Sequence, residues 1–325
     1  MAQESPAKIQ VPKINQVAIA VWDIEEVTQN FWNILGIGPW ETYDWGPPLI
    51  YDRKYYGKPS WAREKISLCR VGPVQIELVQ PVDGQSIYRD FLNERGEGLH
   101  HINWLVEDID KTSSLLAEQG FPSILSGRYG EKCGFSYHPI PPLCTLWEPV
   151  CAGPKSIQPT WIPDTSKPSP AKVKVKAVNQ IAIAVWNLDE VARNFWNILG
   201  IGPWEIYDWA PPLIYDRKYY GKPSWARERI ALCRIGDGVQ LELVQPVEGE
   251  SIYRDFLNKY GEGLHHLNFL VENIDETMAQ LAKEGYPSIL SGRYGEKCGF
   301  SYHPIPPLHT LWEPVCAGPK SVKPT

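Results

Sequence analysis

The sequence predicts an α+β protein of four βαβββ units that pair into two curved-sheet, cup-like domains. The chain of 325 residues repeats itself, so that residues 14–153 recur as residues 178–318 with one added residue in the second copy. Within each copy, a strand-helix-strand pattern runs through several short strands and then starts again. Because one such unit buries little apolar surface alone, we expect two units to pair into one curved sheet.

The repeat divides the chain into two domains and a linker. Segments such as NFWNILGIGPWE and YGEKCGFSYHPIPPL recur unchanged in both copies. The period is far longer than a solenoid unit, so each copy is a domain rather than one turn of an array. Residues 154–177 are rich in Pro, Lys and Ser and predict an extended, exposed linker. Residues 1–12 are predicted to form a loose arm.

The first unit begins with a strand and a helix. Residues 15–22 alternate and are rich in β-branched side chains, which predicts a strand. Residues 23–35 carry apolar side chains at helical spacing behind Asp23, which can cap a helix, and Gly36 then ends it. The Pro-, Tyr- and Trp-rich segment at residues 40–63 predicts a long loop.

Two strands and a second helix complete this unit. Residues 63–71 and 74–80 predict strands that are joined by a Gly-Pro turn. Residues 86–95 predict a short helix capped by Ser86.

The second unit repeats the pattern from residue 99 onward. Residues 99–106 predict a strand, and residues 108–120 predict a helix that stops at Gly120. Three short strands follow in the segments PSILSGR, CGFSYHP and CTLWEPV.

Composition and motifs exclude several classes of protein. The 32 Lys and Arg against 38 Asp and Glu leave no basic stripe, so we expect no nucleic-acid partner. No apolar run is long enough to span a bilayer, and the start lacks the apolar stretch of a signal peptide, so we expect a cytoplasmic protein without a membrane partner. The 7 cysteines, none in a C-x-x-C pair, predict reduced thiols. Nucleotide-binding and serine-hydrolase motifs are missing from the sequence.

Glutamates and histidines lie in the predicted strands. Glu77 stands between two apolar residues, and on the inner face of a curved sheet a carboxylate needs a partner or a metal ion; the alternative is a solvated, outward-facing Glu77. His100 and His101 are neighbours in a strand, so we expect at most one to enter the cup, and either can be a core histidine. Glu148 precedes Pro149 and is either a site residue or an exposed strand-end residue.

The motifs NQVAIAV, VQIELVQP, GEGLHHINWLVEDIDK and TLWEPV resemble the vicinal oxygen chelate superfamily. That family includes glyoxalase I, methylmalonyl-CoA epimerase, extradiol dioxygenases and bleomycin-resistance proteins, and the likeness is closest to the epimerase and glyoxalase-like branch. It covers both halves and implies a tandem fusion of two domains. It also implies one metal ligand from each of four strands per cup, with Gln where most members have His. The implied ligands are Gln16, Glu77, His101, Glu148, Gln180, Glu242, His266 and Glu313.

This resemblance implies a metal-dependent reaction. The ligand set suits Mn, Co, Ni, Mg or Zn, and one His per half does not match the two-His-one-carboxylate triad of Fe(II) oxygenases. The implied activity is an isomerase or epimerase that removes a proton next to a carbonyl of a small oxygenated substrate while the metal stabilises the enolate. Glu148 or Glu77, and Glu313 or Glu242, would be the catalytic base. The alternatives are a metal-free ligand-binding protein with an aromatic pocket, and a lyase or dioxygenase acting on an aromatic substrate.

The predicted loop at residues 40–63 is either a lid over the cup or a surface loop packed by its own aromatic side chains. It and the segment at residues 126–139 supply the candidate substrate-binding residues, with counterparts in the second copy. These candidates are Arg53, Tyr55, Trp61, Tyr137, His138, Arg217, Tyr219, Trp225, Tyr302 and His303. We expect a small-molecule substrate, and either a monomer that mimics a dimer of single domains or a homodimer. Whether each site is built within a half or across the halves stays open.

Overall fold

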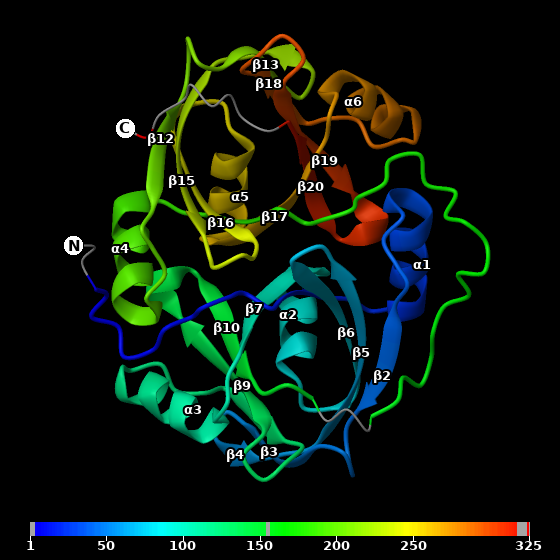
Figure 1. Cartoon of the computed structure of the whole chain (residues 1–325), viewed down its shortest axis with the longest axis vertical. Helices are drawn as coiled ribbons and strands as arrows, with labels where there is room; N and C mark the ends of the chain where they lie inside the picture. Colours follow the sequence, from blue (N-terminus) through cyan, green and yellow to red (C-terminus); the bar gives the residue numbers. More distant parts are fainter. Residues whose placement is uncertain (1–3, 154–156, 317–323, 325) are drawn as a thin grey trace.

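The computed structural model describes residues 4–153, 157–316 and 324. We call residues 14–153 the first half and residues 178–318 the second half; the predicted end of the second half, Gly318, lies outside the described residues. Each half forms its own ten-stranded sheet, and the two lie one above the other in Figure 1. The prediction of two curved, cup-like α+β domains is therefore confirmed.

The elements have the following bounds. The first sheet contains β1 (Gln16–Ala20), β2 (Glu41–Trp45), β3 (Tyr51–Tyr55), β4 (Lys58–Pro59), β5 (Ala62–Val71), β6 (Val74–Gly84), β7 (Gly98–Leu105), β8 (Leu125–Arg128), β9 (Gly134–Ile140) and β10 (Thr145–Val150). The second contains β11 (Gln180–Ala184), β12 (Glu205–Trp209), β13 (Tyr215–Tyr219), β14 (Lys222–Pro223), β15 (Ala226–Arg234), β16 (Gln240–Gly249), β17 (Gly263–Leu270), β18 (Leu290–Arg293), β19 (Gly299–Ile305) and β20 (Thr310–Val315). The helices are α1 (Ile24–Leu35), α2 (Ile87–Arg95), α3 (Ile109–Glu118), α4 (Leu188–Leu199), α5 (Ile252–Tyr260) and α6 (Ile274–Lys283), with short 3-10 turns η1 (Pro141–Leu143) and η2 (Pro306–Leu308).

The order of strands places the two units side by side. The first sheet runs β2-β5-β6-β1-β7-β10-β9-β8-β3-β4, so β6 and β1 of the first unit adjoin β7 and β10 of the second. β1 pairs with β6 in parallel and with β7 antiparallel. These four strands form the middle of the curved sheet, and the right-handed twist of each strand bends the sheet into a cup.

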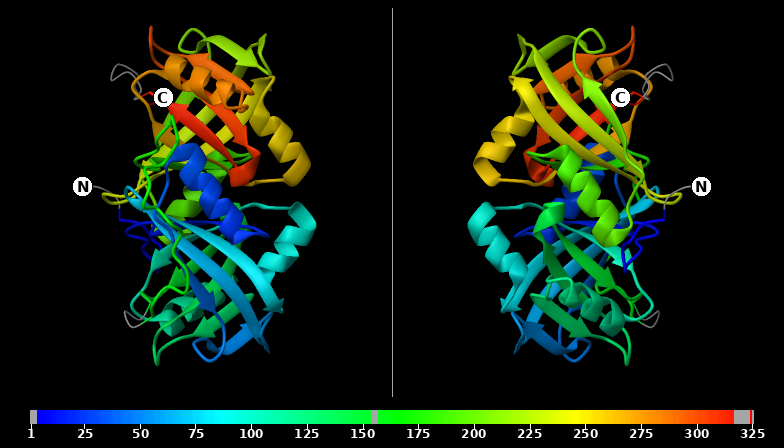
Figure 2. Two further views of the ribbon diagram at one scale, coloured as in Figure 1. Left: turned by 90° about the vertical axis from the view of Figure 1, so that its right-hand side faces the viewer. Right: turned by 90° about the vertical axis from the view of Figure 1, so that its left-hand side faces the viewer.

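The predicted helices form where their caps and apolar faces require. The Asp23 side chain accepts hydrogen bonds from the backbone N–H groups of Glu25 and Glu26, and Gly36 closes α1 in a left-handed conformation. Ser86 caps α2 in the same manner. Figure 2 shows α2 and α5 on the same side of the molecule.

The prediction of a long loop over residues 40–63 is wrong. This segment contains β2, β3 and β4. β2 pairs with β5 at one edge of the sheet, and β3 pairs with β8 at the other. These short strands are stabilised by pairing with strands that are distant in the sequence. Their local sequence therefore lacks a clear strand pattern. The segment therefore extends the cup instead of covering it as a separate lid.

The predictions of a loose arm and of an exposed linker are also wrong over much of their length. Ile9 and Val11 are buried, and the Val11 N–H donates to the carbonyl of Leu199 at 3.0 Å. Val175 in the linker is buried as well, and its N–H donates to the carbonyl of Leu35 at 2.9 Å. The arm thus packs on α4 of the second half, and the linker packs on α1 of the first half.

The two halves share one hydrophobic core. The Phe31 ring of α1 lies 6.1 Å from Trp312 of the second half, and Trp147 lies 5.9 Å from Phe195 of α4. Figure 1 shows α1 beside the strands of the second sheet. The Asn30 amide donates to the carbonyl of Pro307 at 3.3 Å across this boundary. All seven cysteines are free, as the sequence predicts. Among the described residues, no helix is long and apolar enough to cross a membrane.

Candidate metal centre

Three buried side chains meet on the inner face of each cup. In the first half they are Glu77 from β6, His101 from β7 and Glu148 from β10, and one ligand atom of each lies within 4.8 Å of the others. The His101 Nε2 atom is 3.3 Å from Glu77 Oε2 and 3.2 Å from Glu148 Oε2. The second half repeats the arrangement with Glu242, His266 and Glu313. Each triad therefore lies within one half.

A β-bulge sets the direction of the histidine pair. Ala18 of β1 pairs with His101, whereas the next residue, Ile19, pairs with Leu99, so the register shifts around His100. The two neighbouring rings consequently turn toward each other instead of to opposite faces, with their Nδ1 atoms 2.9 Å apart, and only His101 joins the triad. Bulges beside functional sites commonly re-aim a side chain in this way.

The hydrogen bonds of His100 fix the orientation of the His101 ring. His100 bonds to the backbone of Ile87, and burial lowers its pKa, so it is neutral. A neutral His100 that donates one ring N–H to the carbonyl of Ile87 accepts from the His101 Nδ1–H with its other nitrogen. His101 then turns its Nε2 atom toward Glu77 and Glu148. Outer hydrogen bonds of this kind are typical of metal-ligating histidines.

The two carboxylates perturb the titration of the triad. Burial by itself lowers the pKa of His101, but contacts with Glu148 and Glu77 outweigh burial and raise this pKa to about 9. Burial raises the pKa of Glu77, and the charge of Glu148 raises it further while His101 opposes the shift. Without another cation, the site must therefore hold a proton to balance its charge.

The donor set fits a divalent cation. The buried Glu77 Oε2 and His101 Nε2 atoms have no hydrogen-bond partner among the described residues, and their counterparts Glu242 Oε2 and His266 Nε2 lack one too. A divalent ion bound between Nε2 and these carboxylate oxygens would replace the proton that His101 otherwise holds there. Two carboxylates also balance the charge of a divalent ion.

Gln16 lies two residues along β1 from Ala18, the residue that pairs with Glu77 and His101. Gln16 itself pairs with Gln75 and Asn103 on the neighbouring strands. Its amide nitrogen donates to Gln75 Oε1 at 2.7 Å. The atom that Gln16 would offer to a metal is therefore Oε1, the oxygen of its side-chain amide. Gln180 makes the same bond to Gln240.

Asn103 and Tyr88, which the sequence analysis did not single out, help to hold Glu148 in place. The Asn103 amide donates to Glu148 Oε2 at 2.7 Å. The Tyr88 hydroxyl donates to the Tyr137 hydroxyl at 2.6 Å, and Tyr137 in turn bonds to Glu148. Asn103 is two residues beyond His101 in one strand, so alternation alone was the signal that both share the inner face.

Aromatic side chains line the cavity above each triad. The cavity measures about 470 Å³ in the first half and about 440 Å³ in the second. In the first half its lining includes Gln16, Glu77 and Glu148 together with the aromatic residues Tyr43, Trp45, Tyr88, Tyr129, Phe135 and Tyr137. Such a cavity has room for a small organic molecule and places it against the triad.

Of the candidate substrate-binding residues, the structure brings only Tyr137 and its counterpart Tyr302 to these cavities. The side chains of Arg53 and Arg217 are buried in ion pairs with Glu64 and Glu228. Their burial explains why they do not reach the triad.

The remaining candidates lie elsewhere. Tyr55 and Tyr219 donate hydrogen bonds to Asp90 and Asp255. Trp61 and Trp225 are 53% and 49% exposed. His138 and His303 contact Ser136 and Ser301, which alternate with Tyr137 and Tyr302 and so lie on the other face of the sheet.

Comparisons with known proteins agree with this geometry. The family model described as Glyoxalase/Bleomycin resistance protein/Dioxygenase superfamily matches residues 15–137 and again residues 179–302. A curated relative, the uncharacterized protein YqjC of Bacillus subtilis (strain 168), is 23% identical over 129 residues, which are 38% of this chain and 81% of that protein.

Two solved structures are similar over nearly the whole chain. A mutant of 4-hydroxymandelate synthase from Streptomyces coelicolor aligns with a TM-score of 0.61 at 15% identity, covering 97% of this chain and 95% of that one. A fusion of a xylose isomerase-like TIM barrel with 4-hydroxyphenylpyruvate dioxygenase aligns with a TM-score of 0.52 at 14% identity, covering 98% of this chain and 51% of that one. At these identities the likeness shows the fold alone.

Proposed function

Because the chain belongs to the Glyoxalase/Bleomycin resistance protein/Dioxygenase superfamily, we propose that it is a divalent-metal-dependent isomerase or epimerase with one site in each half. One observation carries this proposal. The buried Glu77 and His101 face each other through atoms that lack hydrogen bonds, at the floor of a cavity open to a small molecule. The proposed ligands are Gln16, Glu77, His101 and Glu148, with Gln180, Glu242, His266 and Glu313 in the second half.

The proposed reaction is proton transfer next to a carbonyl. A bound Mn, Co, Ni, Mg or Zn ion supplies a Lewis acid that stabilises the negative charge left on the substrate oxygens. Glu77 is the carboxylate that takes and returns the proton, because it has the raised pKa and no hydrogen bond holds its Oε2 atom. Glu148, held by Asn103, keeps its place as a ligand. Glu242 and Glu313 divide the roles in the same way.

The residues of the cavity favour a small oxygenated substrate. Tyr43, Trp45 and Phe135 offer apolar and aromatic contact on its walls, while Tyr137 places a hydroxyl beside Glu148. The walls would exclude water from the reacting carbon and so strengthen the electrostatic interactions there. A flat or aromatic group of the substrate would lie against these walls.

The dioxygenase alternative has less support. The one solved structure above whose name includes a dioxygenase, 4-hydroxyphenylpyruvate dioxygenase, shares the fold at 14% identity. Each triad here has one histidine and two glutamates, whereas non-haem Fe(II) oxygenases use two histidines and one carboxylate.

Metal analysis tests the ligand assignment. Protein offered Mn, Co or Zn is expected to retain about two ions per chain, one for each triad. The double variant E77Q/E242Q is expected to lose both ions, and the matched variant E107Q/E272Q, which changes an exposed glutamate in each half, is expected to keep them. No retained ion in the unaltered protein, or full retention by E77Q/E242Q, would refute the assignment and favour a metal-free binding protein.

Isotope exchange tests the reaction. The metal-loaded protein would be incubated in heavy water with acyl-CoA thioesters, hemithioacetals and aromatic ketones. We expect deuterium to enter the carbon next to a carbonyl of one of these classes, and we expect E77Q/E242Q to abolish the exchange. Metal retention without exchange in any class would reject the isomerase and leave the lyase or dioxygenase.

A further inference from the structure

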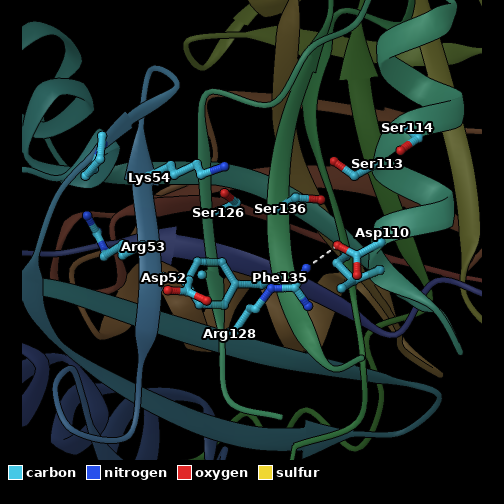
Figure 3. A pocket seen from close by; sticks show the side chains of 13 residues that line it. Asp52, Arg53, Lys54, Asp110, Ser113, Ser114, Ser126, Arg128, Phe135 and Ser136 are labelled. Atoms are coloured by element: carbon cyan, nitrogen blue, oxygen red, sulfur yellow. Dashed lines mark hydrogen bonds and ion pairs between the residues drawn. The ribbon is translucent and has the colours of Figure 1, made fainter. Parts of the chain in front are cut away.

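A second cavity of the first half lies behind the sheet. It measures about 600 Å³ and is formed by α3 together with β3, β8 and β9 (Figure 3). Ser136 of β9 lines this cavity, and its neighbour Tyr137 lines the cavity of the metal centre. Because successive residues of a strand point to opposite faces, the two cavities are on opposite sides of the sheet. Phe135 lines both cavities, but none of the triad residues Glu77, His101 and Glu148 lines this one.

A row of polar side chains crosses three strands in this cavity. Lys54 of β3 pairs with Ser126 of β8, which pairs with Ser136 of β9. Helix α3 adds Ser113 and Ser114 from the opposite wall. Figure 3 shows the Lys54 side chain extending toward the serines. Lys54 forms no ion pair within the described ranges of the chain, and the hydroxyls of Ser114 and Ser126 form no hydrogen bond there.

The buried His138 accepts a hydrogen bond from only one of two nearby serine hydroxyls, Ser113 and Ser136, so the other can donate to a ligand. Its Nδ1–H donates to the carbonyl of Phe121 at 2.7 Å, and burial lowers its pKa, so the ring is neutral and Nε2 accepts. The hydroxyls of Ser136 and Ser113 lie 2.9 Å and 3.2 Å from this one nitrogen. Nε2 has a single lone pair, so only one hydroxyl donates to it at a time and the other can donate to a ligand.

The negative charges of the cavity are Asp110 and Asp52. Asp110 stands one helical turn before Ser113 and Ser114, and Figure 3 shows it beside Ser113 and paired with Arg128. Arg53 is engaged with Glu64. Because Arg128 balances Asp110, the part of the cavity that holds the serines has the unpaired positive charge of Lys54 and several hydroxyl donors.

We propose that this part of the cavity binds a phosphate-type oxyanion, with Lys54 supplying the charge and Ser113, Ser114, Ser126 and Ser136 supplying hydrogen bonds. Each oxygen of such an anion accepts hydrogen bonds, and bonds to a charged acceptor are the stronger kind. The ligand is either free phosphate or the phosphoryl group of a small organic ester. This binding site is independent of the metal-dependent reaction proposed above.

The second half provides an internal control. Met278 and Ala279 of α6 stand where the first half has Ser113 and Ser114, whereas the lysine and the two strand serines are kept as Lys218, Ser291 and Ser301. His303 Nε2 contacts only Ser301 among the described residues. The second half thus lacks the donors from the helix, and we expect one oxyanion site per chain.

Phosphate titration of the full chain, stripped of metal by a chelator, tests the site. Calorimetry with inorganic phosphate at constant ionic strength is expected to give saturable binding at one site. K54M and S113M/S114A are each expected to weaken binding ~10-fold or more, the loss typical of hydrogen bonds to a charged group. The matched variant K218M is expected to leave the affinity unchanged. M278S/A279S, which copies the first half into the second, is expected to add a second site.

Several outcomes would overturn the proposal. These are the absence of saturable binding, an equal loss in K218M and K54M, or unchanged affinity in S113M/S114A. Circular dichroism of each variant separates loss of binding from loss of folding, and S113M/S114A repeats residues that the second half already accommodates. A parallel titration with phenyl phosphate separates the two sources of ligand: tighter binding indicates an organic ester, and equal or weaker binding indicates free phosphate.

Discussion

His138 and His303 show how a single buried side chain links stability to pH. Each donates its Nδ1–H to a backbone carbonyl, of Phe121 and Tyr286 respectively, at 2.7 Å. Burial lowers the pKa of both rings below the usual 6.5. The unfolded chain therefore binds more protons than the folded chain below pH 6.5, and these groups contribute stability above that pH that is lost as the pH falls.

We expect the contribution of His138 and His303 to the free energy of unfolding to fall as the pH is lowered from about 6.5 to about 5. Acidification over this range is therefore expected to destabilise the metal-free double variant H138Q/H303Q less than the unaltered protein, because two of the buried imidazoles that resist protonation are gone. Urea unfolding at several pH values measures the slope of stability against pH for both proteins. Equal slopes would show that these histidines do not contribute to the acid sensitivity.

The sequence predicts the metal-centre residues most clearly where an ionisable side chain stands in an otherwise apolar strand. Glu77, His101 and Glu148 stand in apolar strands, and the structure brings them together. The charge of Arg53 and its place in an aromatic segment predict a contact with substrate, but Arg53 forms a buried ion pair with Glu64, a partner that only the fold supplies. The meeting of the His100 and His101 rings depends on a bulge that no local pattern marks.

Among the elements, the tight pairing of β5 with β6 depends on Gly84. This residue has φ of +81°, and a Cβ atom there would collide with the Trp61 carbonyl oxygen and lie 2.7 Å from Ala62 Cα. Gly57, in the turn between β3 and β4, has a similar φ of +75° but no atom within 4 Å of the position of a Cβ. An alanine at Gly57 would therefore meet backbone strain alone, whereas an alanine at Gly84 would meet backbone strain and crowding.

We expect G57A to cost about 1 kcal/mol of stability, the strain of a left-handed alanine. G84A is expected to cost about 1–3 kcal/mol more, because the added methyl group must also displace backbone. Chemical denaturation of the two variants beside the unaltered protein gives the difference. A cost for G84A no greater than that for G57A would contradict the crowding.

Elements were predictable from the sequence where the local signal and the fold agree. Helix α1 has its cap at Asp23, its apolar face and its glycine stop in one short segment, and it forms as predicted. Strands β2 and β3 have few apolar residues and depend on β5 and β8 for their hydrogen bonds. Such long-range pairing at the edges of a sheet cannot be inferred from composition.

At the scale of the whole molecule, the shared core joins the halves into one folding unit. Phe195 of the second half is fully buried and packs against Trp147 of the first half. The halves thus resemble the subunits of a dimer fused in one chain, and we propose that the chain works as a monomer.

We expect calorimetry to show one cooperative unfolding transition for both halves. F195A is expected to destabilise that transition by about 3–5 kcal/mol without splitting it, since large-to-small changes in a core cost this much. Y220A, which removes an exposed ring, is expected to leave it unchanged. Two separate transitions in the unaltered protein would show that the halves unfold independently.

The crossing of the arm onto α4 also has a consequence for how the chain is made. Residues 9–11 leave the ribosome before the strands of the first half, yet the Leu199 carbonyl that receives the Val11 N–H is synthesised much later. Domains generally fold in order of synthesis, so the first cup can fold before α4 exists for residues 9–11 to pack on. The segment at residues 169–175 faces no such delay, because α1 has already emerged when it is made. The nascent protein thus folds its first half before the arm docks, and the contacts of the arm with the second half form last.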